Sequence, residues 1–260
     1  TGAGVNGLDF DGSNDYVNID AVDSSMTGVT SFTIETWIKV DPAQAGNDMI
    51  FAVNTSSNGS RMFVKLDDGV MEFDIGTSSD VLAGPDLRDD VWHHIAFVFD
   101  NGSLSFYVDG DLSDVETNSV PAFASNDKWS IGQEWDGGGA SDFFNGALNE
   151  LRLWKSVRTA TEISGGRFCE IGNPDTNLVA YYTFNQGVPS GSNTSISSLT
   201  DWSGNAFNGT LSGFALNGSS SNFILASEVG TNCTSFNADV CDALTYTTPS
   251  GAVFSSNGLY

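Results

Sequence analysis

The stretch WHHIAFVFDNGSLSFYVDG, residues 92–110, predicts two antiparallel strands joined by a tight turn. β-Branched and aromatic residues, which favour strands, lie on both sides of Asn101 and Gly102. An Asn-Gly pair readily adopts the positive backbone φ angles that a two-residue hairpin turn requires. Asp109 and Gly110 repeat this signal where the second strand should end. The segment therefore indicates an antiparallel sheet.

Further strands are predicted on both sides of this hairpin. The runs 61–66 and 70–75 flank Asp68 and Gly69, so they should form a second hairpin. Shorter strands are expected at residues 129–132, 179–184 and 209–211. Helical periodicity occurs once, between a possible cap at Thr159 and the glycines at 165 and 166. We expect this short helix to pack on an edge of the sheets.

Two longer segments alternate with the period of a strand. SFTIETWIKV, residues 31–40, is predicted to be half-buried, with one face formed by Phe32, Ile34, Ile38 and Val40 and the other by Glu35, Trp37 and Lys39. ALNELRLW, residues 147–154, is predicted to be a core strand, with Leu148, Glu150, Arg152 and Trp154 alternating with Asn149, Leu151 and Leu153. The fold class is therefore all-β with one short helix.

The composition excludes several classes of partner. The 260 residues include 9 Lys and Arg against 33 Asp and Glu, a formal net charge of −24. This charge repels phosphate backbones and anionic lipid heads, so no nucleic acid partner is expected. Hydrophobic residues make up 40% of the chain but never gather into a membrane-length run, so direct membrane insertion is not expected.

The cysteines lie in the last third of the chain, at Cys169, Cys233 and Cys241. They show no CxxC spacing, which argues against a zinc site. Our hypothesis pairs Cys169 with Cys233, a loop closure that stabilises by about 4 kcal/mol, and leaves Cys241 for a partner beyond Tyr260. The composition also changes near Cys233, where Thr, Pro, Ser and Asp become frequent. We therefore predict a domain at residues 1–232, then a linker and the incomplete start of another module at 233–260.

Four segments, taken in order, resemble the laminin-G-like or concanavalin A-like domains of bacterial surface proteins. They are LDFDGSNDYVNI (8–19), FTIETWIK (32–39), WHHIAFVFDNGSLSFYVDG (92–110) and FNGALNELRLW (144–154). LVAYYTFNQG (178–187) and DWSGNAFNGTL (201–211) are similar to another element of the same family. The resemblance implies a two-sheet antiparallel jelly-roll sandwich. The tail from residue 240 resembles the Cys-containing repeats of long adhesins, which implies a secreted protein of the bacterial cell surface with neighbouring domains.

Catalytic patterns are absent from the sequence. Glycoside hydrolases of this sandwich type place two carboxylates on one strand in an ExDxxE-like pattern. Here Glu134 and Asp136 are followed by glycines at 137–139, so the pattern fails. His93 and His94 are adjacent and should point to opposite faces of a strand, which rules out a two-His metal pair. We predict that the chain is not an enzyme.

Calcium is the positive chemical hypothesis, because this hard ion takes several oxygen ligands from loops. The turn after the first strand offers Asp11, Asn14 and Asp15, plus the carbonyl of Gly12. The family resemblance implies a structural calcium that bridges the first and last core strands, which would add Asn149. Asp201 is a second candidate ligand, although Asp followed by Ser-Gly-Asn is equally an ordinary Asx-turn.

Carbohydrate is the expected ligand. Sugars stack their apolar faces on exposed aromatic rings, and carboxylates accept hydrogen bonds from the sugar hydroxyls. The loop QEWDGGGASDF, residues 133–143, offers Trp135 together with Glu134, Asp136 and Asp142. Trp202 is a weaker candidate for a ligand contact. For either loop Trp, a role in packing is as good an interpretation as a ligand contact. Three functions stay open in this order: a glycan-binding or adhesion module stabilised by calcium, a structural spacer, and a polysaccharide hydrolase.

Overall fold

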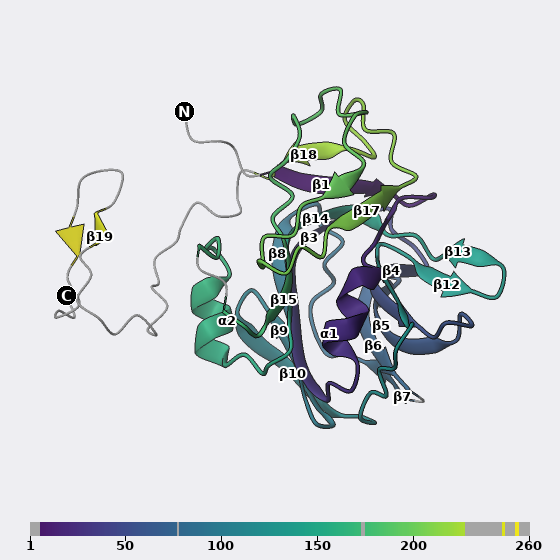
Figure 1. The fold of residues 1–260 in the computed structure, drawn as a ribbon, viewed down its shortest axis with the longest axis vertical. Helices are drawn as coiled ribbons and strands as arrows, with labels where there is room; N and C mark the ends of the chain where they lie inside the picture. The colour runs from purple at the N-terminus through teal and green to yellow at the C-terminus, as the bar shows by residue number, and fades with distance from the viewer. Residues whose placement is uncertain (1–5, 77, 173–174, 227–245, 248–252, 255–260) are drawn as a thin grey trace.

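The computed structural model describes residues 6–76, 78–172, 175–226, 246–247 and 253–254 as two stacked antiparallel sheets (Figure 1). The first sheet has the order β10 (Asp111–Thr117), β9 (Ser103–Val108), β8 (Trp92–Asp100), β3 (Ser31–Val40), β14 (Asn145–Trp154), β1 (Asn6–Asp11) and β18 (Phe223–Leu225), with β15 (Leu178–Tyr182) also paired to β14. The second has the order β16 (Ser198–Leu199), β17 (Gly209–Ser212), β2 (Tyr16–Asn18), β11 (Lys128–Ile131), β4 (Asn47–Asn54), β5 (Ser60–Asp67), β6 (Val70–Ile75) and β7 (Ser78–Val81).

Small elements complete the described structure. Two hairpins stand apart from the main sheets, β12 (Glu134–Asp136) with β13 (Gly139–Ser141), and β19 (Tyr246–Thr247) with β20 (Val253–Phe254). The helical elements are the 3-10 turn η1 (Asp20–Val22), α1 (Asp23–Met26) and α2 (Ala160–Gly166). No helix in the described part of the chain is long and apolar enough to cross a membrane. The predicted all-β jelly-roll sandwich is confirmed, and α1 is a second short helix that the sequence pattern did not reveal.

Aromatic packing between the sheets forms the core. Phe97 on β8 stacks with Phe73 on β6 at 5.7 Å between ring centroids, and with Phe106 on β9 at 5.0 Å. All three side chains are buried, and burying a Phe stabilises a fold by about 1.5–3 kcal/mol. The predicted hairpin turn between β8 and β9 is confirmed, because Asn101 and Gly102 have φ angles of 47° and 104°.

Helix α2 begins with the predicted cap and packs beside the edge of the first sheet. The Thr159 hydroxyl accepts a hydrogen bond from the Glu162 N–H, and the Glu162 carboxylate accepts one from the Thr159 N–H. Ile163 then packs against Ala96 and Tyr107 on the outer face of β8 and β9. The helix therefore covers the outer face of the first sheet next to its edge strand β10.

This cover overturns the prediction that β3 is half-buried. Glu35 and Trp37, which were expected on an open face, are only 3% and 4% exposed. The Trp37 Nε1–H donates to the Arg167 carbonyl at 2.8 Å, in the segment that follows α2. A strand pattern cannot report such cover, because the covering residues lie more than a hundred positions away in sequence.

A bulge in β14 corrects the predicted alternation of that strand. The pairing with β3 shifts register between Asn149 and Arg152, and Glu150 has a φ of 52°. The extra residue places Leu148, Leu151 and Leu153 together in the core. Glu150 and Arg152 consequently lie on the outer face of the first sheet.

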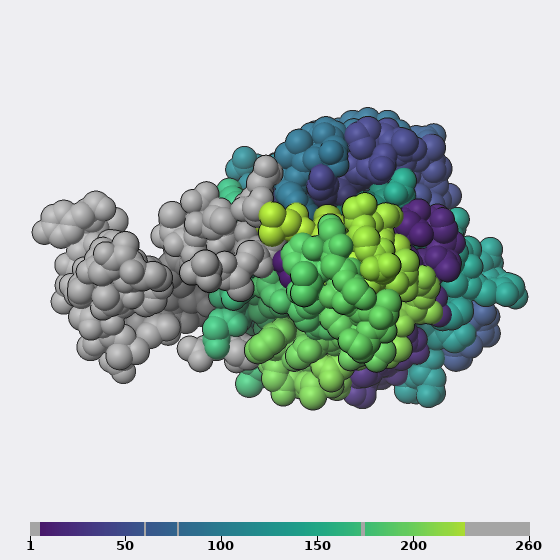
Figure 2. Space-filling view, turned by 90° about the horizontal axis from the view of Figure 1, so that it is seen from above, coloured from purple at the N-terminus to yellow at the C-terminus, as the bar shows by residue number. Residues whose placement is uncertain are grey.

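The first and last strands of the sandwich lie side by side. Asn6, at the start of β1, pairs with Leu225, at the end of β18. Figure 2 shows yellow-green late segments of the chain next to purple early ones. Residues 227–232 and most of 233–260, with Cys233 and Cys241, lie outside the described residues. The predicted domain boundary and the pairing of Cys169 with Cys233 therefore stay predictions.

Candidate functional site

The predicted glycan-binding loop forms the β12–β13 hairpin, which projects from the body of the sandwich (Figure 1). Glu134 pairs with Ser141, and Trp135 pairs with Ala140. The tip holds Gly137 and Gly138, where an added Cβ atom would meet no neighbouring atom within 4 Å. The hairpin thus presents its side chains at the rim of the second sheet, with open space around its tip.

Asn54, at the end of β4, fixes this hairpin to the sandwich. Its Nδ2 donates to the Trp135 carbonyl at 2.9 Å, and its Oδ1 accepts from the Trp135 N–H at 3.1 Å. Asn54 itself is 0% exposed. A buried amide that satisfies both backbone polar groups of one residue sets the position of the residue's side chain. Sequence reasoning missed Asn54, because its partner lies 81 residues away.

The Trp135 side chain is half-buried, so it belongs neither to the core nor to the fully exposed surface. Its edge meets Tyr16 of β2 at 5.8 Å between centroids, and the Lys128 ammonium lies 5.0 Å from its centroid. Its Nε1 is buried without a hydrogen-bond partner. Packing holds the ring in place, while its partial exposure leaves surface for a ligand.

The carboxylates of the predicted loop do gather around this hairpin. Burial raises the pKa of Glu134 to about 7, and the neighbouring carboxyls of Asp142 and Asp136 add to the effect. Asp142 adopts a φ of 48°, and its carbonyl accepts the Met49 N–H of β4 at 2.8 Å. The hairpin therefore combines an aromatic ring with acidic groups that can accept hydrogen bonds.

Nearby polar groups have no hydrogen-bond partner among the residues that the structure describes. Gln133 is 0% exposed, and neither its side-chain oxygen nor its nitrogen has a hydrogen-bond partner. The Ser141 hydroxyl on β13 also has none. Buried polar groups are costly unless they are hydrogen-bonded, so the base of the hairpin needs water or a polar ligand.

The predicted calcium turn is formed, and it offers part of a cation site. The Asp11 carboxylate accepts the Ser13 N–H at 2.9 Å, and the Asp15 carboxylate accepts the Asp11 N–H at 3.1 Å. Asp15 is 0% exposed, and none of the hydrogen bonds among the described residues ends on its Oδ1, while the nearby Ser221 side chain favours the charged carboxylate. Burial, with the negative charges of Asp11 and Asp9, raises the pKa of Asp15 to about 6. An orphaned buried carboxylate oxygen fits a hard cation.

Asn149 cannot bind the same ion as the Asp11 turn, which corrects the prediction that it is a further ligand of that calcium. Asp11 pairs with Asn145, and Asn149 lies four residues further along β14, a separation of about 13 Å along a strand. Ligands of one calcium ion lie within 2.3–2.6 Å of it, so Asn149 and Asp11 cannot bind the same ion. The Asn149 side chain instead donates to the Asn6 carbonyl.

Asp201 is also excluded as a metal ligand by its own contacts. Its Oδ1 accepts the N–H groups of Tyr181 and Ser203, and its Oδ2 accepts the Ser203 hydroxyl and the Phe207 N–H. The Asx-turn alternative is therefore the correct one. Within the described ranges, no three His, Cys, Asp or Glu side chains form a group that could hold a metal ion.

Trp202 belongs to this same turn and lies apart from the β12–β13 hairpin. Its side chain is 58% exposed, and its N–H donates to the Tyr181 carbonyl on β15 of the first sheet. The hairpin is anchored on β4 of the second sheet. Trp202 contacts β15 and its own turn, whereas Trp135 contacts β2, β4 and β11.

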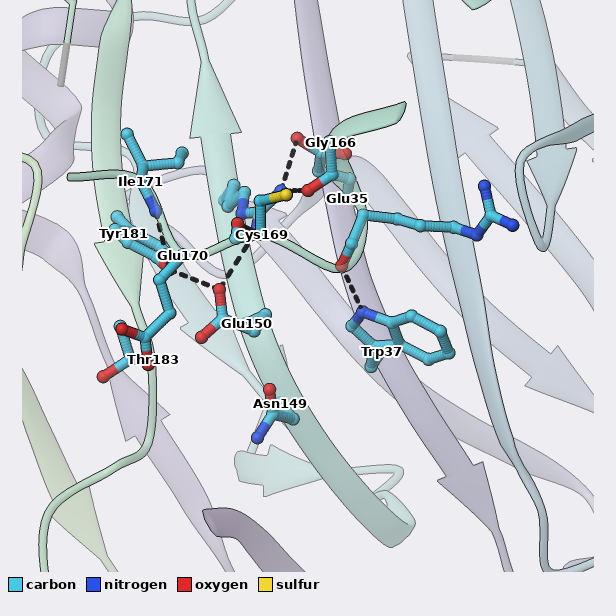
Figure 3. Close-up of polar contacts among 12 residues, drawn as sticks. Glu35, Trp37, Asn149, Glu150, Gly166, Cys169, Glu170, Ile171, Tyr181 and Thr183 are labelled. Atoms are coloured by element: carbon cyan, nitrogen blue, oxygen red, sulfur yellow. Dashed lines mark hydrogen bonds and ion pairs between the residues drawn. The ribbon is translucent and has the colours of Figure 1, made fainter. Parts of the chain in front are cut away.

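A buried ionic network on the outer face of the first sheet was not predicted (Figure 3). Arg152 pairs with Glu150 at 3.0 Å and lies 3.7 Å from Glu35, which His94 approaches at 3.4 Å. Although burial opposes it, the adjacent His94 imidazole and the charge of Arg152 lower the pKa of Glu35 to about 2. The Tyr181 hydroxyl donates to Glu150.

The segment 166–171 closes this network from solvent. Arg152 donates to the carbonyls of Gly166 at 3.1 Å and Cys169 at 2.6 Å. Glu35 and Glu150 are 3% and 4% exposed, so no polysaccharide reaches them. The network is a structural support for the sheet. Its sequence signal is the presence of charged residues at 35, 150 and 152 within otherwise apolar strands, which does not reveal that they pair with one another.

Two stacked antiparallel sheets with an aromatic hairpin at the rim define a jelly-roll module of the lectin type. The family model described as the Concanavalin A-like lectin/glucanases superfamily matches residues 11–164, and the chain belongs to this family.

Individual proteins with a similar sequence or fold are 12–25% identical to this chain over the aligned residues. The chain is 25% identical over 191 residues to the sushi, von Willebrand factor type A, EGF and pentraxin domain-containing protein 1 of Rattus norvegicus, covering 70% of this chain and about 5% of that protein. A solved candidate carbohydrate-binding protein of Bacteroides ovatus superposes with a TM-score of 0.61 at 20% identity, covering 80% of this chain and 58% of that one. The CBM40 module of a Ruminococcus gnavus sialidase, bound to α2,3-sialyllactose, gives 0.50 at 12% identity, covering 61% and 94%.

Proposed function

We propose that this chain is a non-catalytic carbohydrate-binding or adhesion module that contacts its glycan through the β12–β13 hairpin. The observation that supports it most is the half-exposed Trp135 ring, which Asn54 holds in place through both backbone polar groups of Trp135. A ring fixed before binding loses little conformational entropy when a sugar stacks on it.

The acidic groups of the hairpin supply the polar part of such a site. Glu134, Asp136 and Asp142 lie next to Trp135 in the chain or across the hairpin. Carboxylates accept hydrogen bonds from sugar hydroxyls while the ring contacts the apolar sugar face. The sialyllactose bound to the CBM40 relative supports a glycan as the ligand, while the kind of glycan follows from the groups of this hairpin.

The arrangement of the strand ends favours a binding module over a spacer. Because Asn6 and Leu225 are paired neighbours, a polypeptide that continues from both would enter and leave the sandwich at one point. Such a domain adds almost no length to its parent chain. A spacer gains length most efficiently when its ends lie at opposite poles.

One observation favours the hydrolase alternative, namely the pKa of about 7 at Glu134 beside Asp142. A carboxyl with a raised pKa beside a second carboxyl is the pattern of an acid catalyst. Against it, the hairpin is only three residues long on each side and its tip is open. Turnover of a polysaccharide that is lost in Glu134→Gln would establish the hydrolase instead.

We further propose that calcium binds the turn of Asp11, Gly12, Asn14 and Asp15, where the unpartnered Oδ1 of Asp15 supports it. The ion would fix the turn and stabilise the fold, with no role in chemistry. We also infer a secreted cell-surface protein with a Cys169–Cys233 disulfide and a following module. Non-reducing peptide mapping that finds Cys233 linked to Cys241 would contradict this disulfide.

The test of the proposed function is a glycan microarray probed with the whole chain at millimolar calcium. A binding module should retain a related group of glycans. A spacer should retain none.

A further inference from the structure

The charges around Trp135 are unbalanced. Glu134, Asp136 and Asp142 bring three carboxyl groups to the hairpin, while the ammonium next to the ring is that of Lys128. Arg61, on the neighbouring strand β5, is occupied by a two-point ion pair with the buried Asp127 at 3.0 Å. The Arg61 guanidinium on this sheet is therefore already paired.

Lys128 cannot reverse this balance. Its Nζ donates to the Asn58 side chain while it lies over the Trp135 ring. The ammonium is thus held on the ring face, and it offsets one of three carboxyl groups. The rest of the molecule adds to the negative potential, because the chain has a formal net charge of −24.

We infer, on the basis of the proposed function, that the hairpin site takes uncharged sugars and rejects glycans that carry an acid group at the contacted residue. A sugar stacked on Trp135 places its substituents within several ångströms of the hairpin carboxylates. At about 6 Å, repulsion between like charges near a protein surface is enough to weaken binding about tenfold or more. Neutral hydroxyls meet no such penalty, and they donate to the same carboxylates.

The pKa of about 7 at Glu134 supports this selection and gives it a pH dependence. The groups that face Glu134 are Asp142 and Asp136 on the hairpin and Asn54 on β4, with Lys128 on β11 across the Trp135 ring. Below pH 6 the Glu134 carboxyl is protonated, so the rejection of acidic glycans should relax. It should also relax in high salt, because the Debye length falls from about 10 Å at 0.1 M to 3 Å at 1 M.

The experiment is an array of matched pairs, in which each neutral oligosaccharide stands beside its sialylated or uronic acid counterpart. The whole chain is probed at pH 8 in 50 mM and 500 mM NaCl. The charge variant is Glu134→Gln with Asp142→Asn, and the control with the same charge change is Asp111→Asn with Glu116→Gln on β10, in the other sheet.

We expect the wild type and the control to prefer the neutral member at least tenfold in low salt. The charge variant should reduce this preference below about threefold. Equal or tighter binding of the acidic members by the wild type would overturn the inference and leave the proposed function intact, as would an unchanged preference in the charge variant. Binding of no glycan at all would instead contradict the proposed function.

Discussion

Asn54 on β4 and Trp135 on β12 are joined by two reciprocal hydrogen bonds, from Asn54 Nδ2 to the Trp135 carbonyl at 2.9 Å and from the Trp135 N–H to Asn54 Oδ1 at 3.1 Å. These two bonds fix the β12–β13 hairpin to the second sheet, to which the hairpin has few other backbone hydrogen bonds. The fold thereby places an aromatic ring at its rim without burying the ring completely.

Replacing Asn54 should therefore loosen the hairpin. Asn54→Ala removes both bonds and leaves a buried gap, which we expect to lower the free energy of unfolding by about 1–3 kcal/mol. Amide hydrogen exchange across residues 134–141 should accelerate more than exchange in β8, measured by mass spectrometry. Asn58→Gly, which removes the contact to Lys128 and suits the backbone φ of 65° at this position, is the control. Equal acceleration in both variants would contradict the role of Asn54.

The raised pKa of Glu134 predicts that stability falls as the pH rises. The native carboxyl titrates at about 7 instead of its ordinary 4.5, so between these values the native state binds more protons than the unfolded state. Glu134→Gln removes this penalty. We expect the variant to gain about 1 kcal/mol over the wild type at pH 8, after allowance for solvent screening of a half-buried group, and little at pH 4.5. Urea unfolding at several pH values measures this, and a pH-independent difference would contradict it.

Calcium should stabilise the chain through Asp15. At ten times its dissociation constant, a bound ion contributes about 1.4 kcal/mol, which raises the melting temperature of a domain of this size by about 3–6 °C. Asp15→Asn keeps an acceptor for the Asp11 N–H but loses the charge, so its melting temperature should not respond to calcium. The comparison is calorimetry in excess calcium and in excess chelator. A wild-type melting temperature that chelator leaves unchanged would refute the site.

The buried network should matter for stability and not for binding. Arg152→Met leaves Glu35 and Glu150 without their cation, and breaking a buried pair in this way costs about 3–5 kcal/mol. Glu35→Gln, which keeps a polar group, serves if the first variant does not fold. Glycan retention by the folded protein should equal that of the wild type. Loss of binding in a folded Glu35→Gln protein would place the ligand at this face instead.

The sequence predicted the local features of this fold well and the long-range ones poorly. The turns at Asp68-Gly69 and Asn101-Gly102 and the Thr159 cap depend on neighbouring residues, and all three were predicted correctly. The bulge at Glu150 was missed because a Glu with positive φ leaves no pattern. The burial of Glu35 was missed because its cover comes from residues 166–171.

The candidate site divides in the same way. Trp135 and its three acidic neighbours all lie in one short loop, so the sequence alone predicted that they would be close together. The calcium turn is likewise local, whereas Asn149 was added from the family resemblance and lies four residues from the position that pairs with Asp11. Asn54 depends on a contact between distant strands, which only the fold reveals.

The most direct test of the account is a glycan microarray probed in parallel with the wild type, Trp135→Ala and Trp202→Ala. We predict that the wild type retains a group of neutral glycans, that Trp135→Ala reduces their retention at least tenfold, and that Trp202→Ala retains them. An identical pattern from the wild type and Trp135→Ala would contradict the account, and so would a wild type that retains no glycan.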